Sequence, residues 1–250
     1  MLKPRTRAAI ALARETGAHV LLVTGRMFRS VLPYARAAGI VDPVVCYQGA
    51  VVAEPETGRF LLHEPIPLEL AREAIEQVVP AGFHLNCYVN DELYVAEVTP
   101  EARSYADFQG LPIHPVGDLL TWLHEPPTKL VAVGDPEALD GFAVEVKRHF
   151  DGRLFIAKSL PYFLEFASPR VTKGTGLAFV AARLGFGPEE TVAFGDGEND
   201  VELLEWAGYG VAVANAHARV LELADHVCPS VDEEGVAAVL EAWVALHSRA

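Results

Sequence analysis

The chain has 250 residues, 51% of them hydrophobic, so it can bury a sizeable core as one large domain or two smaller ones. Its formal charge of -14, from 34 acidic and 20 basic residues, argues against nucleic acid as a partner, because that binding needs many Lys or Arg contacts to phosphates. Neither an apolar segment behind Met1 nor a run of about 18 apolar residues occurs, which argues against secretion and membrane spanning.

The first part of the chain alternates predicted helices and strands. Residues 4–16 read as a helix, with proline near the start and Gly17 just past the end. A short apolar run at 19–23 reads as a strand, and a helix-like stretch that ends at Gly39 leads to a second apolar run at 44–47. Strands that alternate with helices predict a parallel sheet.

The pattern changes after this point. Residues 50–53 and 59–63 flank a turn-rich segment, which predicts a hairpin. A helix over 68–79, paired strands around the Asn90-Asp91 turn and strand-helix-strand pieces ending in 162–166 predict a separate α+β insert. The wound pattern then returns, and we expect the two α/β stretches to form one discontinuous domain. Its later elements are a helix from Lys173 through Leu184, strands at 191–194 and 210–214, and a helix at 201–207.

The three cysteines, Cys46, Cys87 and Cys228, lie far apart and form no CxxC pair. Neither a disulfide framework nor a zinc site is therefore predicted. We expect three buried thiols in a reducing cytoplasm.

A cluster of acidic residues follows one predicted strand directly, in the sequence GDGEND at 195–200. Ligands of open α/β sheets bind at that carboxyl edge of the strands. Asp196 and Asp200, with Asn199, supply the hard oxygen ligands that Mg²⁺ takes. An EF-hand does not fit, because apolar residues stand where its glycine and its bidentate glutamate belong. A magnesium site is therefore predicted here, and a solvated acidic loop is the alternative.

The sequence Thr24-Gly25-Arg26 ends another predicted strand. A hydroxyl and backbone N–H groups at a helix start can cradle a phosphate, although a threonine that only caps the next helix is the alternative. Lys173, also at a helix start, can give a positive charge to the same phosphate, whereas an isolated lysine is usually just solvated. Neither a Walker A sequence nor a dinucleotide fingerprint is present.

The order of these motifs resembles one family. Thr24 in a TGR turn, an insert of about 100 residues, Lys173 and then GDGEND are similar to the Cof-type phosphatases of the haloacid dehalogenase (HAD) superfamily. The resemblance covers essentially the whole chain. It implies an α/β fold with a HAD-like Rossmannoid parallel-sheet core, formed by residues 1–63 and 164–250, and an inserted α+β cap domain over 64–163.

The resemblance also implies an activity, the hydrolysis of a small phosphorylated metabolite such as a sugar phosphate. In such enzymes an aspartate attacks the phosphoryl group to form an aspartyl-phosphate, and Mg²⁺ neutralises charge. Thr24 is then expected to hydrogen-bond the phosphoryl group, together with Gly25 and Arg26 of the same turn. Lys173 is expected to offset negative charge. Asp196 is expected to bind Mg²⁺ directly, while Asn199 and Asp200 hold the metal's waters or the lysine.

The chain departs from the family at two places. Gln48 stands where relatives often have asparagine before Gly-Ala, so a phosphate or substrate contact at Gln48 involves a side chain one methylene longer. The family also begins with an apolar strand that ends in DxDGT, whose first aspartate is the nucleophile, and the 250 residues contain no DxDGT. In the family this strand lies between the strands that carry Thr24 and Asp196. Without it those neighbours would lie about 10 Å apart with unpaired backbone groups between them.

Three hypotheses follow for the missing motif. The one that we favour is a misplaced start codon or a trimmed sequence, whose native protein is an active phosphatase. The second is a non-catalytic protein that binds phosphate or a sugar phosphate, and the third is an unstable fragment. No oligomeric state is predicted, and the nine histidines show no metal-ligand spacing.

Overall fold

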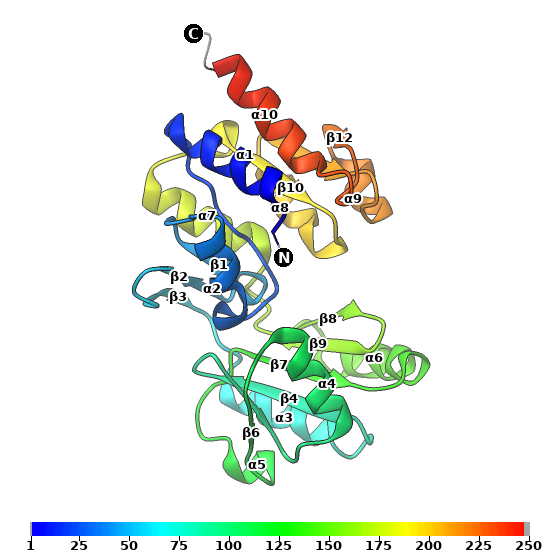
Figure 1. Cartoon of the computed structure of the whole chain (residues 1–250). Helices are drawn as coiled ribbons and strands as arrows, with labels where there is room; N and C mark the ends of the chain where they lie inside the picture. The colour runs from blue at the N-terminus through cyan, green and yellow to red at the C-terminus, as the bar shows by residue number, and fades with distance from the viewer. Residues whose placement is uncertain (1, 248–250) are drawn as a thin grey trace. The chain divides into compact units, whose positions relative to one another are not determined.

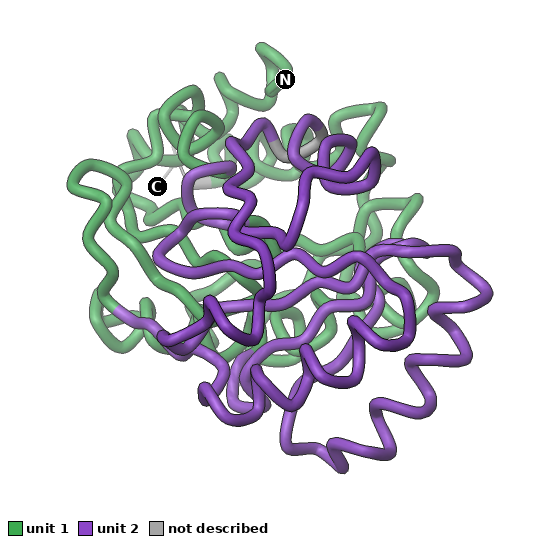
Figure 2. The backbone as a smooth tube through the Cα atoms, turned by 90° about the horizontal axis from the view of Figure 1, so that it is seen from below, with its two compact units in different colours: residues 1–26, 31–61, 172–250 green, residues 27–30, 62–171 purple. Residues whose placement is uncertain are grey.

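A computed structural model describes residues 2–247, and Figure 1 shows its helices and strands. The chain forms two compact units, which Figure 2 distinguishes by colour. The predicted boundary between residues 163 and 164 differs from this division, because it falls within a strand, Phe163–Ala167, that pairs inside the sheet of unit 2. Unit 1 comprises Met1–Arg26, Val31–Leu61 and Thr172–Ala250, and unit 2 comprises Met27–Ser30 and Leu62–Val171.

Unit 1 contains a parallel sheet of three strands in the order β10-β11-β12. The strands predicted at 191–194 and 210–214 are confirmed as β10 and β11. Side chains of Leu177, Ala193 and Leu204 meet in the core beside this sheet. The elements of this region are α7 (Lys173–Leu184), β10 (Val192–Gly195), α8 (Val201–Trp206), β11 (Tyr209–Val213), α9 (Ala218–Leu223), β12 (His226–Cys228) and α10 (Gly235–His247).

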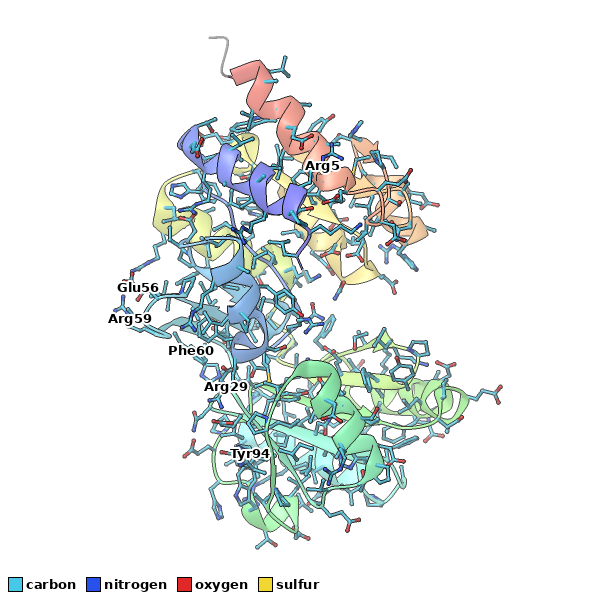
Figure 3. The ribbon with its side chains drawn as sticks, in the orientation of Figure 1. Arg5, Arg29, Glu56, Arg59, Phe60 and Tyr94 are labelled. Atoms are coloured by element: carbon cyan, nitrogen blue, oxygen red, sulfur yellow. The ribbon has the colours of Figure 1, made fainter. Side chains whose placement is uncertain are left out.

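The N-terminal helix packs along the last helix. Helix α1 lies beside α10 (Figure 1), and the Arg5 guanidinium on α1 forms an ion pair with Glu241 on α10 at 2.7 Å (Figure 3). The predicted hairpin is confirmed, because β2 and β3 are hydrogen-bonded neighbours in a sheet of order β1-β2-β3. The elements here are α1 (Pro4–Glu15), α2 (Phe28–Ala37), β1 (Val44–Cys46), β2 (Val51–Ala53) and β3 (Phe60–His63).

The strand predicted at residues 19–23 is wrong in its extent. This segment forms a single parallel bridge, Val23 with Val45, in which the Val45 N–H donates to the Leu22 carbonyl at 2.8 Å. Within residues 2–247, β10 pairs with β11 alone, and no strand joins the 19–23 segment to β10. With a partner along one side only, residues 20–23 remain half-buried instead of buried. The predicted parallel sheet is therefore interrupted where the resemblance puts the family's first strand.

Unit 2 is built on a six-stranded sheet of order β6-β5-β4-β7-β9-β8. Side chains of Leu85, Leu130 and Leu164 share one core with residues of α3 and α6. The Asn90-Asp91 turn joins β4 to β5, and both of its residues have positive φ. Among the described residues, no helix has the length and apolar character needed to cross a membrane. The elements are α3 (Leu68–Val78), β4 (His84–Val89), β5 (Glu92–Val95), α4 (Pro100–Gln109), β6 (Ile113–Pro115), α5 (Leu119–Trp122), β7 (Lys129–Val133), α6 (Pro136–Phe150), β8 (Phe155–Leu160) and β9 (Phe163–Ala167).

The three cysteines are buried thiols, and this leads to a first testable prediction. Cys46 and Cys87 are 0% exposed and Cys228 is 1% exposed, and burial raises the pKa of the Cys87 thiol to about 12. Because the thiolate is the reactive form, a thiol reagent at pH 8 is expected to modify none of the three in the native protein and all three in guanidinium chloride. Absorbance of the released chromophore gives the count. Rapid modification of a native thiol would contradict the packing around it.

Candidate active site

The site begins with the loop Thr24-Gly25-Arg26, which backbone hydrogen bonds hold in place. The Thr24 hydroxyl accepts from the Arg26 N–H at 3.2 Å. The Thr24 carbonyl accepts from the Gln48 N–H at 3.1 Å, and the Arg26 carbonyl accepts from the Tyr47 N–H at 2.9 Å. The loop is therefore fixed against the turn at residues 47–49.

That turn has an unusual backbone. Tyr47, Gln48 and Gly49 have φ values of 52°, 61° and 107°, so three successive residues adopt conformations that favour glycine. Tyr47 and Gln48 are nevertheless buried, at 1% and 6% exposure. At Gly49 a Cβ atom would lie 2.0 Å from the carbonyl oxygen of Thr172, so this position excludes any side chain. Non-glycine residues in such conformations concentrate at functional sites, where the surrounding structure holds them.

The start of helix α7 packs against the turn. Thr172 and Thr175 form a capping box: the Thr172 hydroxyl accepts from the Thr175 N–H at 3.1 Å, and the Thr175 hydroxyl accepts from the Thr172 N–H at 2.9 Å. A Cβ atom on Gly176 would lie 2.9 Å from the Gly49 Cα. These contacts set the position from which Lys173, the first residue of α7, extends its side chain.

Lys173 and Asp200 form a buried ion pair. Lys173 Nζ lies 2.5 Å from Asp200 Oδ1, and the two side chains are 9% and 5% exposed. Asp200 Oδ2 accepts from the backbone N–H groups of Asp196 and Gly197, both at 3.0 Å. Both carboxylate oxygens therefore have partners, as a buried charge requires. The ion pair links the start of α7 to the loop that follows β10.

Two amide side chains extend this ion pair to the TGR loop. Asn199 Oδ1 accepts from Lys173 Nζ at 3.3 Å, and Asn199 Nδ2 donates to Gln48 Oε1 at 3.0 Å. The Gln48 amide in turn covers Gly25, where a Cβ atom would lie 2.4 Å from Gln48 Nε2. The TGR loop, Gln48, Lys173 and the GDGEND loop thus meet in one place within unit 1. Every residue that the sequence nominated for the site belongs to one of these four parts.

Asp196 is an exposed carboxylate at the end of β10. Its backbone carbonyl accepts from the His217 N–H at 2.8 Å, which fixes the loop after β10. Its side chain is exposed, and no hydrogen bond or ion pair to the carboxylate is found among residues 2–247. Asp196 can therefore accept an external ligand, whereas Asp200 is engaged by Lys173 and two N–H groups.

This donor set fits Mg²⁺ in a particular way. Mg²⁺ is usually bound through one or two carboxylates and keeps several waters. Asp196 offers one such carboxylate. The side-chain carbonyl oxygen of Asn199, Oδ1, is a further oxygen in the same loop. Of the two roles expected for Asp200, holding water on the metal or holding Lys173, the structure contains the second. Within the described residues, no group of three or more His, Cys, Asp or Glu side chains forms a metal cluster.

Two residues that hold the site in place, Thr172 and Gly49, were not predicted from the sequence. Thr172 caps the helix that carries Lys173, and the T-x-x-T spacing with Thr175 was a readable capping signal. Glycine is required at position 49 because a side chain there would clash with Thr172. No local pattern predicts this requirement, since Thr172 lies far along the chain.

Comparison with known proteins finds relatives that span nearly the whole chain. A family model for haloacid dehalogenase-like hydrolases matches residues 1–240. A haloacid dehalogenase-like hydrolase from Bacteroides thetaiotaomicron is 26% identical, covers 97% of this chain and 92% of its own, and superposes with a TM-score of 0.88. A protein from Thermotoga maritima is 32% identical, with coverages of 96% and 90% and a TM-score of 0.85.

A curated relative has a named activity. The 5-amino-6-(5-phospho-D-ribitylamino)uracil phosphatase YitU of Bacillus subtilis is 26% identical over 253 residues, which cover 98% of this chain and 92% of the relative. Its name agrees with the enzyme class predicted from the motif order, a phosphoric monoester hydrolase. Because the family model spans nearly the whole chain and the solved relatives share its fold, the chain belongs to the family of haloacid dehalogenase-like hydrolases.

Proposed function

We propose that the protein is a Mg²⁺-dependent phosphatase that hydrolyses a small phosphorylated metabolite, such as a sugar phosphate, through an aspartyl-phosphate. The observation that carries this proposal is the assembly of the TGR loop, Lys173 and the loop of Asp196 around one network, which Asp196 joins through its backbone N–H, although these segments lie far apart in the sequence. Cations and hydrogen-bond donors at the carboxyl edge of a parallel sheet suit a phosphoryl group. We also propose a cytoplasmic location, which the three reduced thiols support.

The roles of the residues follow from their remaining hydrogen-bonding capacity. Lys173 has three N–H donors, and Asp200 and Asn199 take two of them, so the third can bind a phosphoryl oxygen. The Thr24 hydroxyl accepts from Arg26, which leaves its own proton to donate to the same group. Asp196 would hold Mg²⁺, which when bound neutralises phosphate charge.

The nucleophilic aspartate of this proposal is not among the 250 residues, since they contain no DxDGT. We propose that it belongs to a strand between residues 19–23 and β10. The interruption of the parallel sheet at that position supports this placement. An aspartate at the end of such a strand would lie at the same sheet edge as Thr24 and Asp196.

The proposal is tested by comparing two proteins. One is the 250-residue chain, and the other is the same chain preceded by the in-frame residues encoded upstream of Met1. With p-nitrophenyl phosphate and a panel of sugar phosphates, the longer protein is expected to show hydrolysis that EDTA abolishes and MgCl₂ restores. The 250-residue chain should be slower by a factor of about 10³ or more, since it lacks the nucleophile. A longer protein without DxDGT, or with DxDGT but no activity, would overturn the proposal.

A substitution at Asp196 gives a sharper prediction for the longer protein. Asp196→Asn is expected to lower kcat/KM roughly a hundredfold and to raise the Mg²⁺ concentration needed for half-maximal rate, because a neutral amide binds the metal more weakly. Glu198→Gln is the matched control, since Glu198 is an exposed carboxylate of the same loop, 3.9 Å from Arg219. Its rate and Mg²⁺ dependence should match the wild type. Equal effects of both changes would remove Asp196 from the proposed metal site.

One observation favours a second function, the binding of phosphate or a sugar phosphate without turnover. The binding residues are assembled in a chain whose sequence lacks the nucleophile motif. This function predicts that the 250-residue chain binds phosphate in a Mg²⁺-dependent manner and hydrolyses nothing. Measurable phosphatase activity of that chain would exclude it.

A further inference from the structure

The hydrogen bonds that join Lys173 to Gln48 through Asn199 have a defined direction. An ammonium group has donors only, so Lys173 can contact the Asn199 side chain only through Oδ1. Asn199 must then turn Nδ2 toward Gln48, and Gln48 must accept with Oε1. The donor end of the Gln48 amide, Nε2, consequently lies at Gly25. A single cation thus fixes the orientation of two successive amides.

We infer that Gln48 is a positioning residue for Lys173 and that it also turns an N–H donor toward the TGR loop. Gln48 keeps Asn199 Oδ1 on the ammonium group, so that Lys173 is held between Asn199 and Asp200 and directs its third proton to the anion. This inference rests on the proposed function only in taking that anion to be a phosphoryl group.

The length of the side chain supports this role. Gln48 spans the distance from its turn to Asn199, with 3.0 Å between Oε1 and Nδ2. An asparagine is shorter by one C–C bond, about 1.5 Å, and from the same backbone it would leave Asn199 without this acceptor. The backbone of Gln48 is held in a left-handed conformation and is buried, so little freedom remains to compensate. Glutamine at this position therefore connects parts of the site that asparagine would leave separate.

Gly25 offers a way to test Gln48 without changing any polar group. The three atoms nearest to a Cβ atom at Gly25 would all belong to the Gln48 amide, with Nε2 at 2.4 Å, and that amide is the far end of a flexible side chain. Gly25→Ala should therefore displace the Gln48 amide and leave the backbone in place. In Gln48→Ala the same space is empty, so the added methyl group has nothing to displace.

The experiment measures binding of inorganic phosphate in MgCl₂ by isothermal titration calorimetry with the 250-residue chain. Gly25→Ala and Gln48→Ala are each expected to weaken binding about fivefold to tenfold, the effect of losing one hydrogen bond between neutral groups, here the bond from Asn199 to Gln48. The double variant should bind no more weakly than Gln48→Ala alone, because both changes act through one amide. Gln77→Ala, on helix α3 of unit 2, is the matched control and should bind as the wild type does.

A second measurement separates this inference from the proposed function. Hydrogen exchange of the Asn199 side-chain amide, followed by NMR, should accelerate in Gly25→Ala and in Gln48→Ala, while that of Asn215 stays unchanged. The role of Gln48 would be overturned by additive losses of affinity in the double variant. It would also be overturned if the exchange rate of the Asn199 side-chain amide were unchanged in both single variants. If the wild type binds no phosphate but Asn199 responds as expected, the assignment of the anion as phosphate fails for this chain, and the positioning of Asn199 by Gln48 stands.

Discussion

Replacement of Lys173 by methionine is expected to lower the free energy of unfolding by about 3–5 kcal/mol, the usual cost of removing one partner from a buried ion pair. The Asp200 carboxylate would keep its two backbone N–H donors but lose its cation, while its side chain stays only 5% exposed. Phosphate binding should be lost as well, because methionine supplies neither charge nor donor. Urea unfolding followed by circular dichroism gives the first quantity, and calorimetry gives the second.

An exposed ion pair of the same unit is the control for this experiment. Arg5 and Glu241 lie 2.7 Å apart, but their side chains are 45% and 40% exposed. Solvent screens such a pair, so Arg5→Met should destabilise the protein far less than Lys173→Met and leave phosphate binding intact. Comparable losses in both variants would mean that burial adds nothing to the interaction of Lys173 with Asp200.

Substitution of Gly49 by alanine is the second change with a large expected effect. The left-handed φ of 107° disfavours any side chain by about 1–2 kcal/mol, and a Cβ atom 2.0 Å from the Thr172 carbonyl adds an overpacking cost of about 1–3 kcal/mol. The expected loss of unfolding free energy is therefore about 2–5 kcal/mol. Since Thr172 caps α7, the shift should also move Lys173 and weaken phosphate binding.

Gly17→Ala separates the two contributions. Gly17 has a φ of 92°, but nothing lies within 4 Å of the position that its Cβ would take. This variant should lose only about 1–2 kcal/mol, from the backbone conformation, and should bind phosphate normally. Urea unfolding and calorimetry on both variants provide the comparison. Equal destabilisation by the two substitutions would show that the contact between Gly49 and Thr172 is not tight.

Much of the fold could be predicted because local patterns and tertiary structure agree there. Proline near the start and glycine past the end located α1, and apolar runs located β10 and β11. The prediction of a strand over residues 19–23 was wrong in its extent, because a strand requires hydrogen-bonded partners along its length and this segment has a single bridge, from Val23 to Val45. The predicted domain boundary differs from the division into two units at Phe163–Ala167, because the pairing of this segment with β7 and β8 is not encoded in the segment alone.

The residues of the candidate site were nominated by motif order, but their interactions were not. The motifs and the family resemblance nominated Thr24, Lys173 and Asp196 without saying which group would contact which. The contact between Gln48 and Asn199 joins residues 151 positions apart and depends on side-chain conformations that no local pattern specifies. The positive φ of Tyr47 was equally unreadable, because a bulky residue in that conformation is held by its surroundings.

The unpaired side of β10 has a consequence for handling the protein. Along this side the backbone N–H and C=O groups lack strand partners among residues 2–247, and Val192 at the start of the strand is 42% exposed. Such an edge is a template on which strands of other molecules can add, the first step of aggregation. The net charge of -14 keeps the molecules of the 250-residue chain apart at low ionic strength, and salt screens that repulsion. Self-association should therefore increase with salt concentration, and pairing of the edge within the molecule would suppress it.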